Sequence, residues 1–70
     1  MNATHEHLKT LLESVREDLD FAEQKLAYLK TRIAELATSK IPAAQLEMNR
    51  QSFLHDQLQE AISQVKRERN

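Results

Sequence analysis

The sequence predicts an all-α protein folded as a two-helix antiparallel coiled-coil hairpin, and three observations carry this prediction. The 70 residues include no glycine, whereas an average chain of this length has about five. Because β-hairpin turns rely on glycine for positive φ, this absence argues against a sheet. Ala, Glu, Lys, Leu and Arg make up 36 of the 70 residues, a composition typical of long helices and coiled coils. The third observation is the single proline, Pro42, which divides two helical segments.

Pro42 marks the one strong break that we expect in the chain. Proline disfavours the α conformation at Ile41 before it and has no N–H to donate, so a helix ends ahead of it. The first turn of the next helix tolerates proline well. A short turn between two helices also favours antiparallel neighbours. We therefore expect a single domain over residues 1–70, with helix 1 at about 4–38, a turn at 39–41 and helix 2 at about 42–67.

The first expected helix carries nine apolar residues that follow one another in alternating steps of four and three. They are Leu8, Leu12, Val15, Leu19, Ala22, Leu26, Leu29, Ile33 and Leu36. Apolar residues at this spacing are typical of a coiled-coil seam. The stripe runs without interruption, so it predicts one continuous helix.

The second expected helix has a shorter seam. Its members are Leu54, Leu58, Ala61 and Val65. Toward the turn, the polar residues Gln51 and Glu47 interrupt it. Folding the chain near residue 40 brings together positions whose numbers sum to about 80. This register places the basic tail of residues 66–69 beside Glu13 and Glu17.

Apolar side chains outside the two seams predict an interface with another protein. Helix 1 is longer than helix 2 by about eight residues, or about 12 Å, so its first leucines project beyond the hairpin unless another chain covers them. A 70-residue chain also has a small core, which self-association or a partner chain would complete to a bundle. The expected partner-binding residues are Leu8, Leu11, Phe21, Tyr28, Leu46 and Phe53.

Composition also narrows the classes of partner and location. The net charge is −1 and the pI is about 6.3, so no net positive field attracts nucleic acid. No apolar run approaches the roughly 18 residues that a membrane span needs, and the first residues lack the pattern of a signal peptide. We expect a cytoplasmic protein whose partner is another protein, with no nucleic acid, membrane insertion or small-molecule substrate.

Catalytic and metal-binding patterns are not found. His5 and His7 lie two residues apart on a helix, so they point in different directions and cannot share a metal ion, and His55 lies far along the chain. Ser52, His55 and Asp56 follow one another on one helix, without a pocket or an oxyanion hole. The chain has no cysteine for a thiolate zinc site. We expect no enzyme activity and no cofactor.

Three segments resemble the small co-chaperones of the YscE-like group, which protect the needle subunit of type III secretion systems. They are LKTLLESVRE at 8–17, PAAQL at 42–46 and LQEAI at 58–62. The resemblance implies a cytoplasmic hairpin of two antiparallel helices. It further implies a second, helical-repeat chaperone as partner and a needle subunit held unpolymerised, with Leu11, Phe21 and Tyr28 on the docking face.

Two functions follow as hypotheses. The first is a non-enzymatic helical-hairpin interaction module that binds and stabilises or masks a helical partner, with the needle co-chaperone as its most specific form. The alternative is a homodimeric four-helix bundle, a small regulatory protein of host or phage that binds and modulates another protein.

Overall fold

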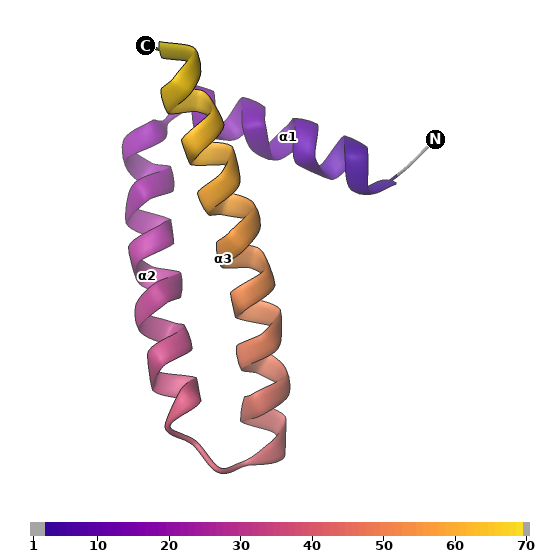
Figure 1. Cartoon of the computed structure of the whole chain (residues 1–70), viewed down its shortest axis with the longest axis vertical. Helices are drawn as coiled ribbons and strands as arrows, with labels where there is room; N and C mark the ends of the chain where they lie inside the picture. The colour runs from indigo at the N-terminus through magenta and orange to yellow at the C-terminus, as the bar shows by residue number, and fades with distance from the viewer. Residues whose placement is uncertain (1–2, 70) are drawn as a thin grey trace.

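The computed structural model describes residues 3–69, which form three α-helices and no strand. The helices are α1 (Ala3–Glu17), α2 (Leu19–Ala37) and α3 (Pro42–Arg69). Figure 1 shows α2 and α3 side by side and antiparallel, while α1 leaves the start of α2 and crosses α3 at a steep angle. The all-α class is therefore confirmed, and the chain adds a third helix to the hairpin.

The expectation of one continuous helix over about 4–38 is wrong, because the helix breaks at Asp18. The backbone of Asp18 has φ −147° and ψ 83°, outside the helical region, and its Oδ1 accepts a hydrogen bond from the N–H of Phe21 at 3.0 Å. Aspartate is among the best residues for this N-cap role. The break is one residue wide, since Asp18 N–H still bonds Ser14 O and Ala22 N–H bonds Asp18 O.

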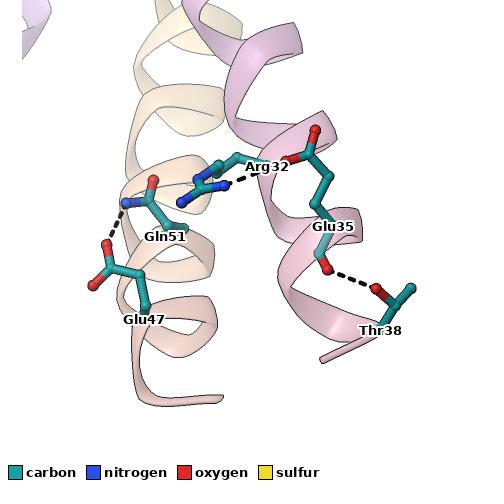
Figure 2. Close-up of polar contacts among 5 residues, drawn as sticks. All are labelled: Arg32, Glu35, Thr38, Glu47 and Gln51. Carbon is teal, nitrogen blue, oxygen red and sulfur yellow. Dashed lines mark hydrogen bonds and ion pairs between the residues drawn. The ribbon is translucent and has the colours of Figure 1, made fainter. Parts of the chain in front are cut away.

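The second break lies where the proline predicts it, and α3 begins at Pro42. α3 continues to Arg69, two residues beyond the expected end. Thr38 closes α2 by donating its backbone N–H and its hydroxyl to the carbonyl of Glu35, the latter at 2.8 Å (Figure 2). The side chain of Gln45 returns from α3 to the carbonyl of Ser39 at 2.7 Å. Side-chain hydrogen bonds thus form a turn that has no residue with positive φ among those described.

The core lies mainly where the three helices meet. Its buried residues are Val15, Ala22, Leu29, Leu58, Ala61, Ile62 and Val65. Every seventh residue from Val15 to Leu36 is buried, so the predicted seam faces the core even though the helix is broken. Near the turn α3 contributes no buried residue, and Gln51 there donates to Glu47 at 2.8 Å (Figure 2). The polar interruption of the second seam therefore leaves α3 without a buried residue at this end of the hairpin, although Leu36 of α2 is buried there.

The predicted overhang of helix 1 is also wrong. Because the chain bends at Asp18, α1 folds back across α3, and Leu11 and Leu12 pack half-buried against the core. Burial of these leucines within the same chain stabilises the bend, since apolar area leaves water without a second molecule.

The basic tail reaches the junction of α1 and α2, but with partners other than Glu13 and Glu17. Lys66 lies 2.6 Å from Glu23 on α2. Arg16 forms a two-pronged ion pair with Glu68 at 2.7 and 3.0 Å, and Arg69 donates to the carbonyl of Arg16. These contacts fix the end of α3 against both other helices.

Candidate protein-binding surface

Four of the six expected partner-binding residues are largely exposed. The exposed fractions are 62% for Phe21, 64% for Tyr28, 72% for Leu46 and 62% for Phe53. Phe21 and Tyr28 are seven residues apart on α2, and Leu46 and Phe53 are seven apart on α3, so each pair shares one face of its helix. We call these two pairs the apolar rows.

A hollow of about 160 Å³ lies between α1 and the hairpin, and we call it the α1 hollow. Its lining residues are His7, Leu11, Lys25, Leu29, Leu54, Gln57 and Leu58. Residues three or four apart on a helix are neighbours. Lys25 is thus a neighbour of both Phe21 and Tyr28, and Gln57 is a neighbour of Phe53. Phe21, Tyr28 and Phe53 are therefore next to residues of the α1 hollow, whereas Leu46 lies farther along α3, toward the turn.

The other two expected residues lie elsewhere. Leu11 is half-buried and lines the α1 hollow, so it is not part of an exposed stripe with Phe21 and Tyr28. Leu8 is 36% exposed and lies at a second hollow, of about 100 Å³, between α1 and α3. The bend at Asp18 is the physical reason, since it carries both leucines onto α3 and away from the line of α2.

Three residues of this surface were missed by sequence reasoning. Leu54 is 39% exposed at the α1 hollow, although its spacing assigns it to the buried seam. Lys25 and Gln57 carry no signal in the sequence, because only the crossing of α1 places them at the hollow. Leu54 follows directly after the part of α3 in which Gln51 and Glu47 interrupt the seam and no residue is buried.

The polar groups at the α1 hollow are incompletely paired. Gln57 has its Oε1 buried without a hydrogen-bond partner, and a buried unpaired oxygen of this kind costs about 1–3 kcal/mol. Lys25 forms no ion pair with residues 7–69. In contrast, Arg32 lies 3.3 Å from Glu35 on the same helix (Figure 2). The rim of the hollow therefore carries one cation with no anion from the rest of this described region.

The pKa shifts lie away from this surface, at the junction of α1 and α3. Hydrogen bonds from the Arg16 guanidinium hold the pKa of the Glu68 carboxyl below its usual value. The same hydrogen bonds raise the pKa of Arg16. Both groups are exposed, so this pair orients the tail and is screened by solvent.

Two of the three histidines, His7 and His55, have side chains that the structure describes. His7 lines the α1 hollow, and His55 is half-buried with its Nδ1 at 3.3 Å from Oδ1 of Asp56. The side chain of His5 lies outside the described residues. Among the residues that the structure describes, no group of three or more potential ligands could hold a metal ion.

No helix within the described range is both long enough and apolar enough to cross a membrane. No protein-family model, curated protein or solved structure matches this chain. The resemblance to the YscE-like co-chaperones therefore stays a prediction, and the geometry of the surface is what carries the functional argument.

Proposed function

We propose that this chain is a non-enzymatic, cytoplasmic interaction module that binds a helical partner on the apolar rows and so stabilises or masks it. The carrying observation is that four large apolar side chains, each more than 60% exposed, form two rows on the paired helices α2 and α3. Three of them, Phe21, Tyr28 and Phe53, are helical neighbours of residues that line the α1 hollow. Single exposed apolar residues are common, but a contiguous group is typical of a protein-binding surface. Binding would bury aromatic side chains, which contribute strongly to protein interfaces.

The spacing of the apolar rows suits a helix. Apolar side chains seven residues apart form a ridge along each helix, and a third ridge from a partner helix fits between two such ridges. In this arrangement an apolar side chain of the partner enters the α1 hollow beside Leu54. A carboxylate one turn along the partner helix would pair with Lys25.

The most specific form of the proposal is a needle co-chaperone of the YscE-like group. Its support is the resemblance of the segments 8–17, 42–46 and 58–62. In this form, covering one apolar face of a helix of the needle subunit would hold that subunit unpolymerised. The homodimeric regulatory protein is the competing outcome, in which a second copy covers the apolar rows.

Purification of the tagged chain from its native host tests the proposal. The variant with Phe21→Ser and Tyr28→Ser should lose a stoichiometric partner that the unchanged chain retains. Ile41→Ser is the matched control, because Ile41 is as exposed as Tyr28, at 64%, but lies in the turn. The control should retain the partner. Equal retention by all three forms, or a homodimer that the double variant dissociates, would contradict the proposal.

A further inference from the structure

α1 is joined to the hairpin through one non-helical residue, Asp18. The apolar steps of four and three continue across this residue without a shift, and no glycine or proline lies nearby. The backbone hydrogen bonds from Asp18 to Ser14 and from Ala22 to Asp18 already have the helical spacing of four. Movement of Asp18 into the helical region would therefore make α1 and α2 one straight helix over residues 3–37.

A straight helix cannot keep α1 on its own α3. Glu23, near the start of α2, pairs with Lys66, three residues before the end of α3. Figure 1 shows that α3 ends a little beyond the start of α2, so a straight extension of α2 would carry the N-terminal part of α1 past that end. Leu11 and Leu12, which pack against the core in the bent chain, would lose their cover.

The surface of α3 that receives α1 is present in every copy of the chain. This surface comprises residues of α3 that line the two hollows beside α1 or belong to the buried core. Among them are Leu58, Ala61 and Val65. The hollows of about 160 and 100 Å³ beside α1, and the unpaired Oε1 of Gln57, indicate that α1 is held less tightly than α2 is. Release of α1 thus breaks a smaller set of contacts than unfolding of the hairpin.

We propose that α1 exchanges between two copies of this chain, each straightening at Asp18 and placing its α1 on α3 of the other copy. The partner in this exchange is a second copy of the chain, because α1 is the segment that packs on this surface of α3 in the structure. The exchanged dimer re-forms the contacts of α1 with α3, including the Arg16–Glu68 pair, and gains two uninterrupted helices in place of two N-caps. Exchange of an identical element is a low-cost route to a dimer. This inference does not depend on the apolar rows or on the proposed function.

Asp18→Ala tests the exchange through the monomer–dimer equilibrium. The substitution removes the N-cap that holds the bend and introduces the best helix former. Loss of an N-cap shifts the equilibrium between the bent and the straight chain by about fivefold toward the straight form. The exchanged dimer has two straightened hinges, so its Kd should fall about 30-fold. Asp18→Asn keeps a capping side chain, and Asp20→Ala removes the same charge two residues away, so both should behave as the unchanged chain. Light scattering over micromolar to millimolar concentrations measures the molar mass.

Cross-linking distinguishes exchange from side-by-side association. Arg16 and Glu68 are in contact at 2.7 Å, so we mix single-cysteine variants Arg16→Cys and Glu68→Cys and add a short bis-maleimide linker. We expect a cross-linked product that contains one copy of each cysteine variant. It should form when both variants also carry Asp18→Ala, and it should form at high protein concentration when both keep Asp18. Lys40→Cys, at the turn, replaces Arg16→Cys in the control and should give no such product. A chain that stays monomeric with Asp18→Ala, or a dimer without the cross-link between positions 16 and 68, would overturn the proposal.

Discussion

Replacing Leu12 with alanine tests directly whether α1 folds back onto the hairpin. Leu12 is half-buried against the core because α1 crosses α3. Replacing a fully buried leucine with alanine lowers the unfolding free energy by about 3 kcal/mol. Because Leu12 is half-buried, Leu12→Ala should lower it by about 1.5 kcal/mol. If residues 4–38 formed one straight helix, Leu12 would lie beyond the end of α3, and its replacement would cost almost nothing.

Leu46→Ala is the matched control for this measurement. Leu46 is 72% exposed on α3, so the same chemical change there should alter stability by less than about 0.5 kcal/mol. Urea unfolding followed by far-ultraviolet circular dichroism gives both values, and two protein concentrations tenfold apart reveal any contribution from dimers. Equal stability of the two variants would refute the folded-back position of α1.

Three further predictions follow from the contacts of α1. Gln57→Leu removes the unpaired buried oxygen and should raise the unfolding free energy by about 1 kcal/mol in urea titration, whereas a loss of stability would show that Gln57 is paired in solution. Val15→Ala removes two methyl groups from the most buried position of α1 and should lower the unfolding free energy by about 2 kcal/mol; a loss as small as that of Leu46→Ala would contradict its burial. Because Arg16 lowers the pKa of Glu68, this pair adds stability above the unfolded carboxyl pKa and loses it as the pH falls through the lower, folded value. Glu68→Gln should therefore flatten the dependence of Tm on pH below about pH 4.5, and an unchanged acid slope would dismiss the link.

Elements that depend on local chemistry could be predicted from the sequence. Pro42 acts through its own ring and missing N–H, so the start of α3 follows from that one residue. The buried positions of α2 follow from the heptad spacing of Ala22, Leu29 and Leu36. These predictions do not require knowledge of which residues of another helix pack against them.

The bend at Asp18 could not be predicted from the apolar pattern, because the pattern is the same on both sides of it. A cap signal was present, since aspartate at position 18 is followed by Asp20 in the first turn of α2. The choice between a straight and a bent helix depends on the burial of Leu11 and Leu12 on α3, which is a long-range contact. The helix propensities of the residues around Asp18 do not include the free energy gained from that burial.

The candidate surface was predicted in part for the same reason. Phe21, Tyr28, Leu46 and Phe53 lie away from the seams, so helical periodicity alone indicates that they are exposed. The place of Leu11 depends on the bend, and its assignment to the exposed stripe was therefore wrong. The α1 hollow and its rim residue Lys25 exist only because three helices meet there.

The molar mass of the species purified from the native host shows whether this chain binds a helical partner. Light scattering on the purified sample separates a mixed complex from a self-association product. We predict a mass that exceeds one or two copies of the 8.1 kDa chain by that of a distinct protein, in a whole-number ratio. A sample that contains this chain alone, with a mass of twice 8.1 kDa, would contradict binding of a helical partner.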